Sequence, residues 1–236
     1  MLRVEDRVAQ AIRPPLARRL LAEFLGSGLL AAVVVGSGIT AQRLSPYDVG
    51  VQLAENALAT GAGLVALILM FGPVSGAHFN PVVTVADRVL GGLSTRDAVS
   101  YVSVQLPGCC LGAVLANGMF AEPLVAASGR VRGGGGLWLA EMLATAGLVL
   151  VVFAVTRSGR SAVAPFAVAS YIASAYLWTS STSFANPAIT VARTLSDTFS
   201  GIAPRSAPAF VASQVLGAAF GVLAVKTLYP EDAVPA

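Results

Sequence analysis

Two asparagine–proline pairs provide the side chains best placed to contact a polar solute. Asn80-Pro81 and Asn186-Pro187 each follow a short polar segment within an otherwise apolar stretch. Asparagine is a favoured helix N-cap and proline fits the first turn, so each pair predicts the start of a short helix. The amide groups would then donate hydrogen bonds to the oxygen of water or of a polyol, beside positive helix ends that disfavour cations. This chemistry is the recognition and passage of a neutral solute.

The other reactive residue types are too few for catalysis or metal binding. His78 is the only histidine, and the only cysteines, Cys109 and Cys110, are adjacent in the sequence. Adjacent cysteines offer neither a disulfide framework nor the spacing of zinc ligands. We therefore expect the cysteines to pack in the core, and we expect no catalytic residue, no metal ion and no cofactor.

The composition argues against a soluble protein. Hydrophobic residues make up 56% of the 236 residues and charged residues only 11%, whereas a soluble domain carries about 25% charged residues. The net charge of +3 comes from scattered arginines, so no basic face predicts a nucleic-acid partner. We expect a polytopic membrane protein, with the lipid bilayer as its surroundings.

Long uncharged stretches predict six membrane spans, since a crossing helix needs roughly 20 apolar residues. The spans lie near residues 20–42, 52–72, 98–118, 137–156, 163–181 and 207–228. Two further stretches, about 80–90 and 186–196, are too short to cross and begin at the asparagine–proline pairs. With the N-terminus inside, ten of the fifteen Lys and Arg residues fall on the cytoplasmic side. This bias predicts that the N-terminal segment 1–19 and the tail 229–236 are both cytoplasmic.

The chain consists of two copies of one unit. The same order of motifs occurs at Glu23, Asn80 and Gln105 and again at Glu141, Asn186 and Gln214. Three spans per copy is an odd number, so the second copy must be inverted, a pattern typical of solute pathways with a site near the midplane. We expect a first repeat at 20–121, a connecting loop at 122–136 and a second, inverted repeat at 137–228. The predicted fold is all-α, with six transmembrane helices and two re-entrant half-helices that meet N-terminus to N-terminus.

The half-helices would supply the midplane of a pore. Its expected residues are Asn80, Pro81, Val82, Asn186, Pro187 and Ala188. Irregular backbone at this depth is tolerated only where it is covered by protein or borders a wet cavity. Glu23 and Glu141 lie within apolar spans, where a carboxylate needs partners.

Three features resemble the aquaporin and aquaglyceroporin channels: the segment Ser75-Gly-Ala-His-Phe-Asn-Pro81, the Asn186-Pro-Ala188 motif and the glutamates near the start of two spans. The resemblance covers residues 18–228 and implies a right-handed aquaporin-like bundle, one pore per subunit and a homotetramer. It assigns Glu23 and Glu141 to holding the backbone of the re-entrant loops. Gln105 and Gln214 are expected to support the same loops, and His78 to pack at the cytoplasmic mouth.

The outer constriction departs from that family. Most members place an arginine directly after the second Asn-Pro-Ala, but this chain has Ile189 there. Counted from the motifs, the same resemblance implies a selectivity filter of Thr60, Tyr176 (or Ser174), Ser183 and Ile189. Such a ring is uncharged and wider than a strict water filter. Arg193, one helical turn further on, either reaches back to the outer mouth or lies at the surface among lipid headgroups.

The sequence around the second motif is similar to a bacterial aquaporin branch associated with arsenic resistance. That similarity implies a passive channel of the inner (plasma) membrane for arsenite as neutral As(OH)3, methylated arsenicals, glycerol-like solutes and water. A water-selective aquaporin is the alternative, favoured if Tyr176 narrows the ring. Two hypotheses of other classes are a coupled transporter that uses Glu23, Glu141 or His78, and a structural membrane protein whose pore is closed by Tyr176 or Trp178.

Overall fold

The computed structural model describes residues 14–230, and the regular structure in this part of the chain is entirely helical. Within these residues, six helical segments are long and apolar enough to cross a membrane. They contain α2 (Leu16–Leu44), α3 (Val49–Ser75), α5 (Thr95–Met119), α6 (Gly135–Arg157), α7 (Ala164–Trp178) and α9 (Ala207–Leu228), and the segments of α7 and α9 also include the 3-10 turn before each helix. Two short helices, α4 (Pro81–Val89) and α8 (Pro187–Ala192), begin at the two asparagine–proline pairs. The 3-10 turns η1 (Ser161–Val163), η2 (Arg193–Leu195) and η3 (Pro204–Ser206) precede α7, follow α8 and precede α9.

The observed helices differ from the predicted spans at their ends. α2 includes Arg18, Arg19 and Arg43 in its terminal turns, since long basic side chains at helix ends can reach the polar interface. The fifth span ends at Trp178 instead of 181, because the backbone of Thr179 is extended. The second half-helix is also shorter than the predicted 186–196, with α8 giving way to η2 after six residues.

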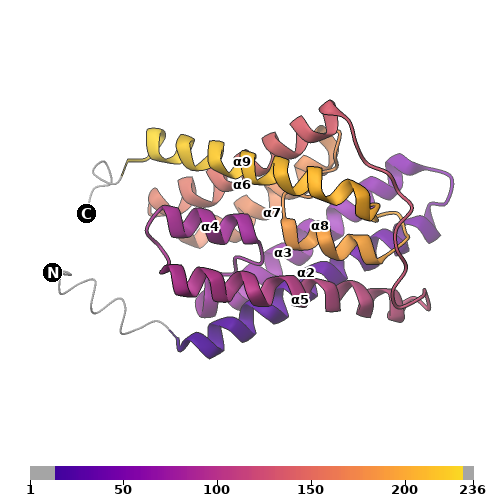
Figure 1. Cartoon of the computed structure of the whole chain (residues 1–236), viewed down its shortest axis with the longest axis horizontal. Helices are drawn as coiled ribbons and strands as arrows, with labels where there is room; N and C mark the ends of the chain where they lie inside the picture. Colours follow the sequence, from indigo (N-terminus) through magenta and orange to yellow (C-terminus); the bar gives the residue numbers. More distant parts are fainter. Residues whose placement is uncertain (1–13, 231–236) are drawn as a thin grey trace.

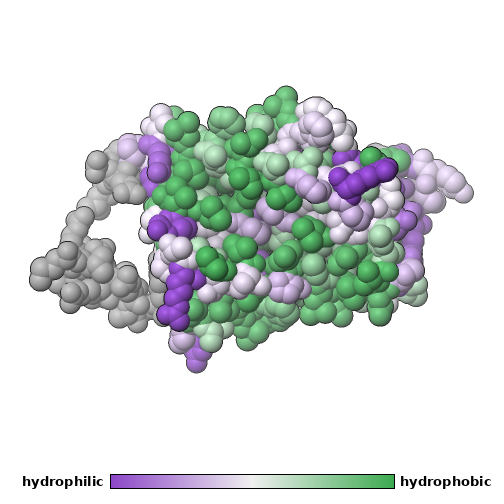
Figure 2. Space-filling model, in the orientation of Figure 1, coloured by the Kyte–Doolittle hydropathy of each residue, from purple (hydrophilic) through white to green (hydrophobic). Residues whose placement is uncertain are grey.

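The two halves of the chain repeat one packing scheme. α2 packs against α5 and α3, and α6 packs against α9 and α7. The short helices cross between halves, because α4 contacts α9 and α8 contacts α5. Figure 1 shows α4 and α8 end to end in the middle of the bundle, with the start of α2 and the end of α9 at the same end of the molecule. Figure 2 shows apolar residues across the middle of this face and hydrophilic residues near both ends.

Glycines bring the long helices close together at the spans that carry the glutamates. A Cβ atom on Gly112 of α5 would lie 1.9 Å from the carbonyl oxygen of Gly28 on α2. A Cβ atom on Gly217 of α9 would lie 2.3 Å from the carbonyl oxygen of Met142 on α6. Such contacts are typical of small residues at membrane helix interfaces. They fix α2 against α5 and α6 against α9, and so position the polar side chains between them.

Candidate functional site

The two asparagines cap the short helices at the centre of the molecule. Asn80 Oδ1 accepts a hydrogen bond from the backbone N–H of Val82 at 3.1 Å. Asn186 Oδ1 accepts from the N–H groups of Ala188 at 3.0 Å and Ile189 at 3.2 Å. Each proline occupies the first helical turn, where its missing N–H is not needed. The positive ends of both helix dipoles therefore face the centre of the bundle.

The same asparagines tie the two re-entrant loops to each other. Asn80 Nδ2 donates to the carbonyl oxygen of Ala185 at 2.8 Å, and Asn186 Nδ2 donates to that of Phe79 at 2.8 Å. An amide nitrogen carries two N–H groups, so each asparagine keeps one donor beyond this bond. Both asparagines border the central cavity, and the second donor is available to a solute there.

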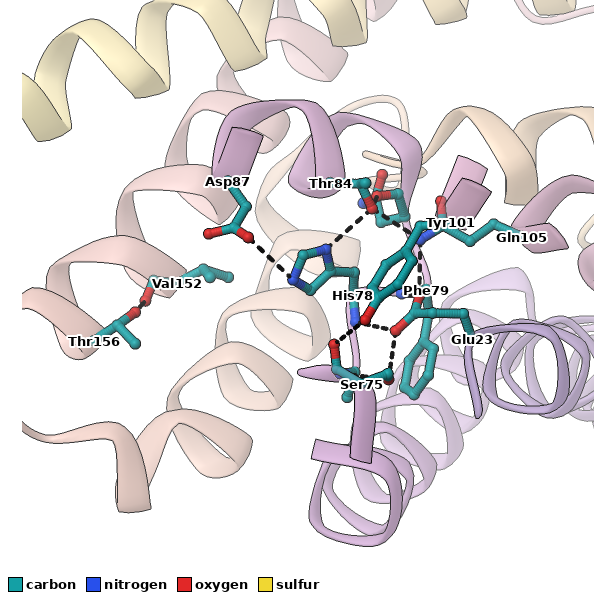
Figure 3. A network of polar contacts seen from close by, with 12 residues as sticks. Glu23, Ser75, His78, Phe79, Thr84, Asp87, Tyr101, Gln105, Val152 and Thr156 are labelled. Atoms are coloured by element: carbon teal, nitrogen blue, oxygen red, sulfur yellow. Dashed lines mark hydrogen bonds and ion pairs between the residues drawn. The ribbon is translucent and has the colours of Figure 1, made fainter. Parts of the chain in front are cut away.

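A buried carboxylate holds the first loop. Glu23 is fully buried, and its oxygens accept hydrogen bonds from the N–H of His78 at 3.0 Å and the N–H of Phe79 at 2.8 Å. Gln105 Nε2 donates to the same carboxylate at 2.8 Å, and Ser75 Oγ at 2.6 Å. Figure 3 shows these donors converging on Glu23. The network satisfies backbone groups that neither a helix nor lipid would satisfy.

The second loop has the same support. Glu141 is fully buried and accepts from the N–H of Phe184 at 2.8 Å, the N–H of Ala185 at 3.0 Å and Gln214 Nε2 at 2.6 Å. Gln214 also donates to Thr190 Oγ1 at 2.9 Å. Phe79 and Ala185, each directly before its asparagine, have φ angles of 50° and 46°. Non-glycine residues adopt this left-handed region at a cost, so the carboxylates stabilise a strained backbone.

His78 is held in place beside the first half-helix. Its Nδ1 lies 3.1 Å from Thr84 Oγ1 and its Nε2 lies 3.8 Å from Asp87 Oδ2 (Figure 3). Its ring is edge-on to Tyr101, whose hydroxyl donates to the carbonyl oxygen of Ser75 at 2.9 Å. The side chain is packed and hydrogen-bonded, and it also borders the cavity.

A cavity of about 260 Å³ extends between the two loops, with both asparagines in its wall. The four sequence-derived filter residues, Thr60, Tyr176, Ser183 and Ile189, all border it. Thr60 Oγ1 and the Tyr176 hydroxyl are 3.4 Å apart, and Ser183 Oγ has no hydrogen-bond partner among the described residues. This part of the cavity wall thus combines hydroxyl-bearing side chains with the aliphatic side chain of Ile189. Ser174, the alternative to Tyr176, is exposed and donates to the carbonyl oxygen of Tyr171 instead.

Some midplane residues chosen from the sequence lie away from the cavity. Val82 packs in an apolar cluster with Val149 and Phe153, and Ala188 is also buried in apolar packing. Pro81 and Pro187 form the first turns of the short helices and do not border the cavity either. The next residue of each half-helix, Val83 and Ile189, borders the cavity instead. Successive helical side chains point about 100° apart, which moves the lining position by one residue.

Arg193 borders the cavity. Of the two positions considered for it, the one at the surface among lipid headgroups is therefore wrong. The side chain is 2% exposed, with Nε donating to the carbonyl oxygen of Ser200. Its guanidinium carbon lies 3.4 Å from the centroid of the Phe184 ring. Neither Ser200 nor Phe184 could be recognised as its partner from the sequence, because each depends on how a loop folds back.

The cysteines lie outside the cavity wall. Cys109 is fully buried and its thiol faces the carbonyl oxygen of Ser27 at 3.5 Å. Cys110 is half-buried on the next helical position. Within residues 14–230, no group of three or more His, Cys, Asp and Glu side chains is arranged to hold a metal ion.

Comparisons with known proteins agree with this architecture. The model of the Major intrinsic protein family matches residues 10–185. The chain is 48% identical over 203 residues to Aquaglyceroporin AqpS of Rhizobium meliloti (strain 1021), covering 86% of each protein. It is 34% identical over 142 residues to the lens fiber major intrinsic protein of Gallus gallus, covering 58% of this chain and 52% of that protein. The X-ray structure of the aquaglyceroporin from Plasmodium falciparum matches with a TM-score of 0.68 at 16% identity, covering 93% of this chain and 98% of that one, and so shares its fold.

Proposed function

The chain belongs to the major intrinsic protein family, whose members are membrane channels and not enzymes, and from that premise we propose that its cavity is a passive pore for glycerol-like polyols, arsenite and water. One observation carries the proposal: the cavity that both asparagines border is also lined by Thr60, Tyr176, Ser183 and Ile189, with an uncharged residue at position 189. Neutral solutes cross such a ring without losing a charge–charge interaction or paying for the desolvation of an ion.

The chemistry of the ring suits small triols. The Tyr176 and Thr60 hydroxyls offer hydrogen bonds in the cavity wall, and Ile189 offers an apolar contact. Glycerol and As(OH)3 are both neutral, carry three hydroxyls and are larger than water. An isoleucine that replaces the usual arginine leaves room for them, and methylated arsenicals would use the same apolar side. The relative from Rhizobium meliloti is named an aquaglyceroporin, which favours polyol passage over strict water selectivity.

The setting of the pore is part of the same proposal. We infer two inverted repeats at 20–121 and 137–228, joined by the segment 122–136, in the inner (plasma) membrane. The start of α2 and the end of α9 lie at one end of the bundle (Figure 1), and the Lys and Arg bias assigns that end to the cytoplasm. Exposed apolar side chains such as Leu58 and Met70 face lipid or the neighbouring subunits of a homotetramer.

The test is stopped-flow light scattering on proteoliposomes under matched gradients of water, glycerol and neutral arsenite. We expect glycerol and arsenite fluxes well above those of empty liposomes. Ser183→Ala should lower glycerol flux relative to water flux, because a polar group in the cavity wall is lost. Ser174→Ala, on the exposed face of α7, is the matched control and should change neither.

The other outcomes separate the alternative functions. Water flux without glycerol or arsenite flux would establish a water-selective aquaporin. Solute flux that requires a proton gradient would establish a coupled transporter. No flux of any solute from folded protein would support a closed, structural membrane protein.

A further inference from the structure

Arg193 and Asp87 occupy equivalent positions in the two inverted repeats. Each is the seventh residue after the asparagine of its asparagine–proline pair (87 − 80 = 193 − 186 = 7). Each contacts the residue two places before that asparagine: Asp87 Oδ2 lies 3.8 Å from His78 Nε2, and the Arg193 guanidinium lies over the Phe184 ring. Both side chains border the cavity, so the repeat symmetry puts an acidic group at one mouth and a basic group at the other.

The side chain of Arg193 lies in the wall of the cavity. The side chain is 2% exposed and borders the cavity together with Tyr176, Ser183 and Ile189. Its Nε is used by the carbonyl oxygen of Ser200, but its Nη1 is buried without a hydrogen-bond partner among the described residues. A guanidinium remains protonated in proteins. An unpaired donor on a buried cation is costly.

Neighbouring groups compensate this charge only in part. Arg132 lies on the same side, with its guanidinium carbon 5.2 Å from the centroid of the Phe184 ring and its Nε donating to the carbonyl oxygen of Gly201 at 2.9 Å. Burial lowers the pKa of Arg132 to about 10, and the charge of Arg130 lowers it as well, so Arg132 is still cationic at neutral pH. Glu141 is the acidic neighbour, and its attraction for Arg193 is opposed by the charges of Arg132 and Arg130.

We propose that Arg193 is the cation-excluding residue of the outer pore, placed one helical turn beyond the position where the family usually has its arginine. This inference rests on the proposed channel function. The ring at Ile189 can then be wide and apolar while the charge barrier lies just outside it. At an effective dielectric constant of about 20, the repulsion between two unit charges about 5 Å apart reduces cation occupancy roughly 250-fold. Size selection and charge selection are thereby carried by different residues.

The test uses proteoliposomes that report two fluxes from the same protein. Glycerol flux is measured by light scattering, and proton flux by a trapped pH-sensitive dye under a potassium diffusion potential. Arg193→Gln removes the charge but keeps a donor for the carbonyl oxygen of Ser200. Arg193→Lys keeps the charge. Arg205→Gln, an exposed outer arginine, is the matched control for the change in net charge.

We expect R193Q to conduct glycerol and to pass protons at least tenfold faster than the wild type. R193K and R205Q should retain wild-type exclusion, and adding Ile189→Arg to R193Q should restore it. If R193Q conducts glycerol but passes protons at the wild-type rate, the inference is overturned and the channel function stands. A wild type that passes neither glycerol nor water would instead overturn the channel function. If R193Q does not fold, Arg193→Met is the second neutral variant, because its aliphatic side chain still packs against Phe184. The same two fluxes are measured for it.

Discussion

The carboxylate of Glu141 can be tested by the smallest possible change, Glu141→Gln. The wild-type oxygens accept three hydrogen bonds, from the N–H of Phe184, the N–H of Ala185 and Gln214 Nε2. A glutamine has one oxygen and one NH2 group, so at least one of these donors must face another donor. The nearly isosteric variant therefore probes hydrogen bonding without leaving a cavity.

The magnitude follows from the count of donors. One buried donor left unsatisfied costs about 1–3 kcal/mol, and the two remaining bonds weaken by roughly 1 kcal/mol together when their acceptor loses its charge. The variant buries a neutral amide in place of a charged carboxylate, and the smaller desolvation cost offsets part of this loss. We expect a loss of about 3 kcal/mol in the free energy of unfolding, or roughly 6–12 °C in melting temperature for a chain of this size. The left-handed backbone at Ala185 would relax, and its carbonyl oxygen would no longer hold Asn80 in place.

The assay is thermal unfolding in detergent together with glycerol flux in proteoliposomes. Glu122→Gln is the matched control, because Glu122 forms a solvent-accessible ion pair with Arg43 at 2.8 Å. An ion pair of that kind is worth at most about 1 kcal/mol, so the control should lose less than about 4 °C and keep its flux. If E141Q and E122Q had the same melting temperature and the same flux, the role assigned to Glu141 in supporting the loop would be refuted.

Three further outcomes are expected. Ile189→Arg should suppress glycerol and arsenite flux more than water flux, because the longer side chain narrows the ring; equal loss of both would contradict the filter assignment. Gly217→Ala should lower the melting temperature strongly or prevent folding, since its Cβ would lie 2.3 Å from the carbonyl oxygen of Met142. Gly136→Ala, with open space around it, is the control and should be tolerated. Similar behaviour of the two variants in thermal unfolding would count against close packing of α6 and α9. The double variant C109A/C110A should keep arsenite flux within about twofold of the wild type, because packing residues outside the pore tolerate small apolar replacements; a large loss would place the thiols on the arsenite path.

Much of the fold could be predicted from the sequence because its strongest signals are local. The scarcity of charge over about 20 residues marks each span, and an asparagine–proline pair marks a helix start regardless of its surroundings. Tyr176 was placed at the cavity by counting residues from the second motif. The first motif indicated Val82, but the next residue, Val83, borders the cavity instead. The face of a helix that borders the cavity depends on how α4 packs against its neighbours, and the motif does not specify this.

The partners of Arg193 could not be predicted, because they are set by the return of the chain after α8. Ser200 comes back to Arg193 only after an irregular segment, and Phe184 meets it from the other side of the half-helix. A loop of this kind carries no periodicity from which a contact could be inferred. The one signal available was the internal repeat, which pairs position 193 with Asp87.

The bonds between the two re-entrant loops have a consequence for how the protein is made. Asn80 donates to a carbonyl oxygen 105 residues further along the chain, and Asn186 donates to one 107 residues back. During synthesis the first three spans therefore leave the ribosome with a re-entrant loop whose partner does not yet exist. That loop has to wait, still hydrated or shielded by the insertion machinery, until the fifth span and the loop after it have been inserted. Pore assembly is thus a late, long-range step of biogenesis, and a chain stopped before Ala185 lacks the second loop that would lock the first.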